Sequence, residues 1–125
     1  MSRNDLLLLA ALVVAVIGLV HSILGERVVF PRLFALPDLP LLRRDRTYTV
    51  HVLRYAWHLT SVAWWAFAAI LIMVWLGAAD MRRASVLIVA LTLLASGVVI
   101  LATAGRRHPA WPLFLVAGLA ALYGA

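Results

Sequence analysis

The chain contains no cysteine, no lysine and few charged residues of any kind. Without cysteine it can form no disulfide, no thiolate metal site, no c-type haem attachment and no iron–sulfur ligation. Any metal or haem would therefore have to be bound by histidine, carboxylate, tyrosine or backbone groups.

Charged residues make up only 13% of the 125 positions, whereas 66% are hydrophobic, and the mean hydropathy is +1.04. A soluble domain has about half apolar and about a quarter charged residues, so this composition predicts an integral membrane protein. The net charge of +6 is carried entirely by arginine. In a membrane protein, arginine reflects topology signals and contacts with anionic head groups of the lipid bilayer, rather than nucleic-acid binding.

Four apolar stretches are separated by polar segments, and each is expected to form a membrane-spanning helix, because about twenty apolar residues suffice to cross a bilayer. The expected spans are residues 5–24, 47–76, 84–104 and 109–124. Gly25 is expected to end the first of them. The sequence thus predicts a single all-α domain over residues 1–125, an integral membrane four-helix bundle with up-down-up-down topology.

The distribution of arginines predicts the orientation. In that topology the first and third connections lie on one side and carry seven arginines, whereas the other side carries three. The arginine-rich side tends to face the cytoplasm. Both termini are therefore expected to be periplasmic or exterior.

Polar side chains inside the apolar stretches predict a ligand site. The segment HVLRYAWHLTSVAWW, residues 51–65, places ionisable groups within a predicted span, and at membrane depth such groups usually face the protein interior and mark function. The predicted topology brings the end of the first span close to the start of the second. A polar layer is therefore expected on the cytoplasmic half, formed by His21, Glu26, His51, Arg54 and His58.

Three chemistries would use this layer. In the first, imidazoles and a carboxylate bind a transition metal ion. In the second, two histidines from facing helices supply the axial ligands of a b-type haem, and Arg54 pairs with a propionate. In the third, the layer forms a pocket for a quinone, a lipid phosphate or a proton path. Tyr55, Trp57 and Trp65 are expected to pack around the site. No motif specifies a reaction, and no catalytic residue is predicted.

Structural roles compete with ligand binding at each position. An ion pair of Glu26 with Arg54 or Arg27 would reduce the cost of charge at the membrane boundary, and His21 would form an interhelical hydrogen bond. His51 lies near enough to the interface to be solvated. The tryptophans are typical of interface anchors and packing.

The motifs HSILGE at residues 21–26 and AWHLTS at residues 56–61 resemble those of uncharacterised small bacterial four-helix inner-membrane proteins. The resemblance implies a four-span protein of the bacterial inner membrane. It implies no activity, cofactor or catalytic residue.

Two functions are favoured for this chain over a third, a stand-alone transporter or enzyme. One is a small membrane protein that binds a metal, a b-type haem or a quinone-like ligand in its His/Glu/Arg layer. The other is a non-catalytic accessory subunit that packs against a larger membrane complex. A homo-oligomer is compatible with either function.

Overall fold

Every regular element of the protein is a helix in the part of the chain that the computed structural model describes, residues 3–125 with side chains from Asp5 onward. The main helices are α1 (Arg3–Leu24), α3 (Arg46–Trp75), α4 (Met81–Thr103) and α5 (Ala110–Tyr123). Short helical segments lie at the connections: η1 (Gly25–Val29), α2 (Phe30–Leu33), η2 (Leu42–Arg44) and η3 (Gly105–Arg107). The all-α prediction is confirmed.

Three helical segments are long and apolar enough to cross a membrane: Asp5–Leu33, Arg46–Trp75 and Met81–Thr103. The fourth expected span contains a helix, but α5 has only 14 residues. At 1.5 Å per residue it is about 21 Å long, shorter than a hydrocarbon core of about 30 Å. Length and apolarity thus support a membrane protein with three candidate spans.

The first helix does not end at Gly25, contrary to the prediction from sequence. A π-helical turn, η1, follows α1 directly and leads into α2, so the helical path continues to Leu33. The amide of Phe30 bonds to the carbonyl of Gly25, five residues back. Such a turn rotates the following residues relative to a regular α-helix, and here Phe30 is almost fully buried, with its ring against Trp57 and His58 of α3.

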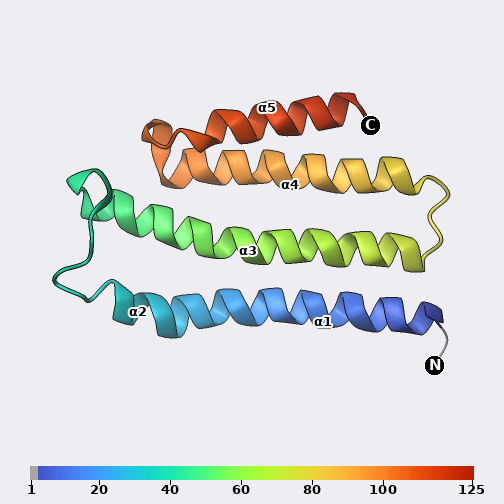
Figure 1. The fold of residues 1–125 in the computed structure, drawn as a ribbon, viewed down its shortest axis with the longest axis horizontal. Coiled ribbons are helices and arrows are strands. Elements are labelled where there is room, and N and C mark those ends of the chain that lie inside the picture. Colours follow the sequence, from blue (N-terminus) through green and yellow to red (C-terminus); the bar gives the residue numbers. More distant parts are fainter. Residues whose placement is uncertain (1–2) are drawn as a thin grey trace.

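The four main helices lie side by side in one row, in the order α1, α3, α4, α5 (Figure 1). Extensive contacts join only neighbours in this row. Both described chain ends lie at the same end of the row as the turn between α3 and α4 (Figure 1). Successive main helices therefore run in opposite directions, and α1 and α5 are at opposite edges of the row.

Two glycine–tryptophan pairs position α1 against α3. Gly18 faces the indole of Trp65, and Gly25 faces that of Trp57. Each indole N–H donates to a backbone carbonyl of α1, Trp65 to Ala15 at 3.1 Å and Trp57 to His21 at 3.0 Å. A carbonyl oxygen has a second lone pair, so it accepts these bonds without losing its helical one. The absence of a side chain on each glycine permits this approach.

Small residues similarly allow α4 and α5 to approach closely. Gly97 of α4 faces Leu115, and Gly118 of α5 faces Leu94. The hydroxyl groups along α4 are satisfied within their own helix: Thr92 donates to the carbonyl of Ile88 and Ser96 to that of Thr92. These two hydroxyls are therefore satisfied without a partner on another helix.

The polar connection between α2 and α3 is tied to the start of α3. Asp45 caps α3 by accepting a hydrogen bond from the amide of Tyr48, and the Arg46 guanidinium donates to the carbonyls of Phe34 and Leu36. The amide of Leu42 donates to the Thr49 hydroxyl. These bonds place the end of α2 beside the first turns of α3, which is where the predicted site lies.

Candidate functional site

Glu26 is the centre of a cluster of charged and polar side chains between η1 and α3. One carboxylate oxygen, Oε1, lies 2.8 Å from Nε2 of His58 and 2.9 Å from Nε of Arg54. The contact with His58 is a hydrogen bond, whereas the Arg54 N–H is not aligned with the oxygen, so that contact is an ion pair. The predicted ion pair of Glu26 with Arg54 is therefore present.

A hydrogen-bonded chain leads from Glu26 into the protein through His58. The other ring nitrogen of His58, Nδ1, lies 2.9 Å from Oγ of Ser22 in α1, and Ser22 lies 2.9 Å from Oγ of Ser61 in α3. Ser61 is completely buried. The four side chains Glu26, His58, Ser22 and Ser61 thus connect a half-exposed carboxylate to the α1–α3 interface.

This chain satisfies both protonation states of His58. A neutral imidazole with its hydrogen on Nε2 donates to Glu26 and accepts from Ser22, which in turn accepts from Ser61. An imidazolium donates to Glu26 and to Ser22, and Ser22 then donates to Ser61. Because hydroxyl hydrogens rotate, both ring nitrogens of His58 keep a hydrogen-bond partner in either arrangement.

Arg54 is held by aromatic rings as well as by Glu26. Its guanidinium carbon lies 5.5 Å from the ring centroid of Phe30 and 5.7 Å from that of Phe34. A guanidinium over an aromatic face is attracted by the ring quadrupole. These rings come from the segment that continues beyond Gly25, so the π-turn brings both the carboxylate and the aromatic partners to Arg54.

His21 lies in the α1–α3 interface but does not join the Glu26 cluster. Its ring stacks on that of Trp57, with centroids 4.2 Å apart and an interplanar angle of 4°, and it meets the edge of Trp64. Its Nε2 atom is buried without a hydrogen-bond partner. Trp57 and Trp65, which were predicted to pack around the site, contact Gly25 and Gly18 and donate hydrogen bonds to carbonyls of α1.

His51 is separated from Glu26 but faces the same side of α3 as Arg54, Tyr55 and His58. These four residues line a narrow cavity of about 130 Å³ between α3 and α4, together with Val99 and Thr103. A second cavity of about 70 Å³ shares three of the residues and continues along the same helices to Leu59, Val62, Ala95 and Ser96. The two cavities together are called the α3–α4 groove below.

The groove combines apolar walls with unpaired polar groups. The hydroxyl of Tyr55 is buried near Ser96 without an aligned hydrogen bond. An unpaired buried hydroxyl costs about 1–3 kcal/mol, and a ligand oxygen in the groove would recover that energy. Arg54 also retains N–H groups beyond the one that faces Glu26.

The depth of the site follows from the length of α4. Val99, which lies beside Arg54 and His58, is four residues before the end of α4 at Thr103, or about 6 Å along the axis. Helix α4 has 23 residues and is about 34 Å long, so it exceeds the hydrocarbon core only slightly. In a bilayer crossed by α4, the cluster would therefore lie near the edge of the hydrocarbon core. In the structure, 42% of the Glu26 side chain and 43% of the Arg54 side chain are exposed.

The structure thus brings together Glu26, Arg54 and His58, places His51 farther along the same face of α3, and places His21 in a separate aromatic stack. Sequence analysis missed Ser22 and the continuation of the first helix to Phe30. The signal for Ser22 was its position beside His21 in the HSILGE motif. Nothing in the residue types indicated that it would bond to His58, because that contact joins different helices.

Comparison of the chain with protein-family models, with curated proteins and with solved structures gave no match. The functional argument therefore depends on the geometry of the site.

Proposed function

We propose that this chain is a small protein of the bacterial inner membrane that binds a quinone-like ligand in the α3–α4 groove, beside the Glu26–Arg54–His58 cluster. The observation that carries the proposal is the position of this ionic, hydrogen-bonded cluster. It lies within the candidate membrane spans and adjoins an apolar groove that contains the unpaired Tyr55 hydroxyl. Ionisable groups at such a depth are costly and are typical of functional sites.

The chemistry of the groove matches a flat ring that carries oxygens. Tyr55, Arg54 and His51 offer hydrogen-bond donors. Leu59, Val62 and Val99 supply apolar contacts. Ligand sites are usually largely apolar with a few convergent polar groups. His58 lines both cavities of the groove, so an imidazole, a common proton donor and acceptor, lies beside a ligand whose oxygens gain or lose protons when it is reduced or oxidised.

The metal and b-type haem predictions have less support from this arrangement. Both ring nitrogens of His58 already have partners, and His21 stacks directly on Trp57. Within residues 3–125, no three side chains of histidine, aspartate or glutamate are arranged as ligands of one metal ion. Both cofactors remain predictions, and an absorption spectrum with elemental analysis of the purified protein tests them directly.

Replacement of Tyr55 by phenylalanine tests the ligand site. Titration of the detergent-purified protein with a short-chain ubiquinone, followed by tryptophan fluorescence quenching, should show saturable binding that weakens about 5- to 10-fold in Tyr55→Phe, because one hydrogen bond of about 1 kcal/mol is lost. The ligand-free variant should be no less stable than the wild type, since the hydroxyl lacks an aligned partner. 

The matched control is Tyr123→Phe, because that tyrosine is 97% exposed near the chain end and its loss should leave the titration unchanged. Equal affinity of the Tyr55→Phe variant and the wild type would argue against the groove as the binding site. Quenching that never saturates in the wild type would argue against any specific quinone site.

The single-row arrangement supports the alternative function, an accessory subunit of a larger membrane complex. Helices α1 and α5 each pack extensively on one neighbour only, and large apolar side chains such as Leu113, Val116 and Leu119 of α5 are more than half exposed. A partner helix would pack against such an edge. This function predicts co-purification of a partner that is lost when Leu113 and Val116 are replaced but retained in Tyr55→Phe.

The proposed topology has four spans with both termini in the periplasm, and α5 would cross as a short span. Because the chain lacks cysteine, single cysteines can report its orientation. In Ala79→Cys, in the turn between α3 and α4, a membrane-impermeant maleimide should label intact spheroplasts. In Ala35→Cys, in the first connection, labelling should require lysis. Both alanines are exposed, so the reverse pattern would overturn the orientation.

A further inference from the structure

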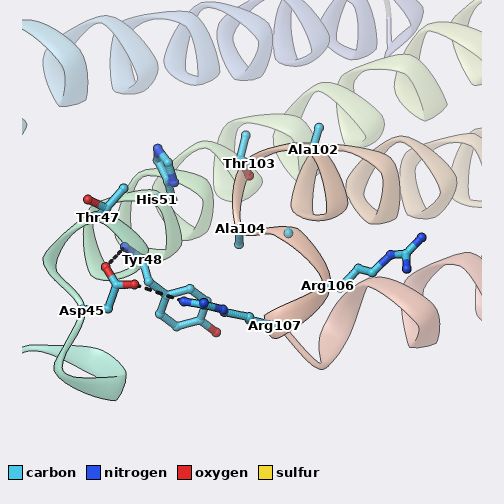
Figure 2. A pocket seen from close by; sticks show the side chains of 10 residues that line it. Asp45, Thr47, Tyr48, His51, Ala102, Thr103, Ala104, Arg106 and Arg107 are labelled. Atoms are coloured by element: carbon cyan, nitrogen blue, oxygen red, sulfur yellow. Dashed lines mark hydrogen bonds and ion pairs between the residues drawn. The ribbon is translucent and has the colours of Figure 1, made fainter.

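A second, wider recess lies at the arginine-rich end of the row and adjoins the α3–α4 groove. It has a volume of about 430 Å³ and lies between the first turns of α3, from Asp45 to His51, and the end of α4 with the η3 turn, from Ala102 to Arg107 (Figure 2). These segments are the ends of two candidate membrane spans. In a bilayer the recess would therefore open at the level of the lipid head groups.

Arginine dominates the charge around this recess. Arg106 and Arg107 line it, and Arg43 lies over the ring of Tyr48 at 5.5 Å. The acidic residue of the recess, Asp45, is already engaged: one carboxylate oxygen accepts the Tyr48 amide, and the other lies 3.3 Å from Arg107. The side chains of Asp45 and Arg107 meet across the recess in Figure 2.

Arg106 is the cation without a local counter-charge. It is exposed, and no ion pair joins it to an acidic side chain among the described residues. In Figure 2 its side chain extends away from the Asp45–Arg107 pair. The protein thus neutralises its own carboxylate with Arg107 and leaves the neighbouring guanidinium available to an external anion.

Helix dipoles do not determine whether the recess favours an anion or a cation. The N-terminus of α3 presents partial positive charge to the recess, whereas the C-terminus of α4 presents partial negative charge. These contributions oppose each other, so the excess of arginine determines that an anion is favoured. Guanidinium groups bind phosphate oxygens with strong, charge-assisted hydrogen bonds.

We infer that this recess binds the phosphate group of an anionic phospholipid at the membrane surface. The phosphate lies against Arg106 at the edge of the recess formed by the η3 turn. The acyl chains lie along α4, where Val98 is exposed one turn deeper. The lipid, rather than free phosphate, is the expected source because the charged rim and this apolar surface are adjacent, and only a phospholipid contacts both. The recess adjoins the α3–α4 groove, because His51 and Thr103 line both, but Arg106 lines only the recess.

Native mass spectrometry of the detergent-purified protein tests this inference. The protein is mixed with equal amounts of dioleoyl-phosphatidylglycerol and dioleoyl-phosphatidylcholine, and the bound lipid is counted. The wild type should retain one phosphatidylglycerol in preference to phosphatidylcholine. Arg106→Gln should lower the apparent affinity for phosphatidylglycerol roughly 5-fold, as expected for about 1 kcal/mol per arginine near an anionic surface.

Arg82→Gln is the matched control, because it removes the same charge from an exposed position at the opposite end of α4 and should leave the affinity unchanged. Equal losses in both variants, or equal retention of both lipids by the wild type, would overturn the assignment. A parallel titration adds millimolar inorganic phosphate. Displacement of phosphatidylglycerol by phosphate in the wild type would show that the site recognises free phosphate and overturn the lipid assignment; persistence of the lipid supports it.

Discussion

The Gly25→Ala variant is expected to lose about 2–3 kcal/mol of unfolding free energy, the cost typical of overpacking a close helix contact. A Cβ atom at Gly25 would collide with the indole ring of Trp57, which occupies the space that a side chain would need. The collision would also displace the indole N–H from the carbonyl of His21. Unfolding in mixed detergent micelles with increasing sodium dodecyl sulfate, followed by circular dichroism, measures this loss.

Gly124→Ala provides the control for this experiment, because a Cβ atom there makes only ordinary van der Waals contact, 3.5 Å from the carbonyl oxygen of Ala120. This variant should match the wild type. If Gly25→Ala were equally stable, Trp57 would have to move without cost. The glycine–tryptophan contact would then not be what holds α1 against α3 at this level.

Replacement of Glu26 by glutamine is expected to destabilise the protein by about 2 kcal/mol and to abolish quinone binding. Glutamine has nearly the same size, but it removes the negative charge between Arg54 and His58. A hydrogen bond to a charged partner contributes about 1.5–3 kcal/mol, and partial exposure of these side chains keeps the loss below that of a fully buried pair. Arg54 would then be left without a counter-ion just inside the membrane boundary.

Asp38→Asn removes the same charge from an exposed position in the first connection and serves as the control. It should change neither stability nor the quinone titration. The affinity for quinone is measured on Glu26→Gln samples kept below their unfolding transition. A lower unfolding free energy with unchanged quinone affinity would show that the cluster has only a structural role. Unchanged stability and unchanged binding together would contradict both roles of Glu26.

The composition and the apolar stretches were enough to predict the helices, because a bilayer interior requires backbone hydrogen bonds to be satisfied within each segment. Arg54 and His58 are four residues apart in the sequence, a spacing that puts two side chains on one face of a helix, and both line the same cavity on α3. Helical periodicity is a local property, so it can be read from neighbouring residues along one segment.

The course of the chain beyond Gly25 was predicted wrongly from the same local reasoning. A glycine followed by charged residues is typical of a helix end, yet here the helix continues through a π-turn. The burial of Phe30 and the bonds of Glu26 to α3 accompany this continuation. Those contacts involve residues about thirty positions away, so local propensity contains no information about them.

The sequence by itself determined that this is an all-helical chain with apolar segments of membrane-spanning length, and that its few ionisable side chains inside those segments come mainly from residues 21–58. Only the tertiary structure decided which of these side chains meet. Glu26 pairs with Arg54 and His58, Ser22 joins them, and His21 stacks apart on Trp57. The physical reason is that each pairing depends on the register between antiparallel helices. Glycines on one helix leave space for tryptophan rings of the neighbouring helix, and these contacts set the register. One helix by itself therefore does not specify the register.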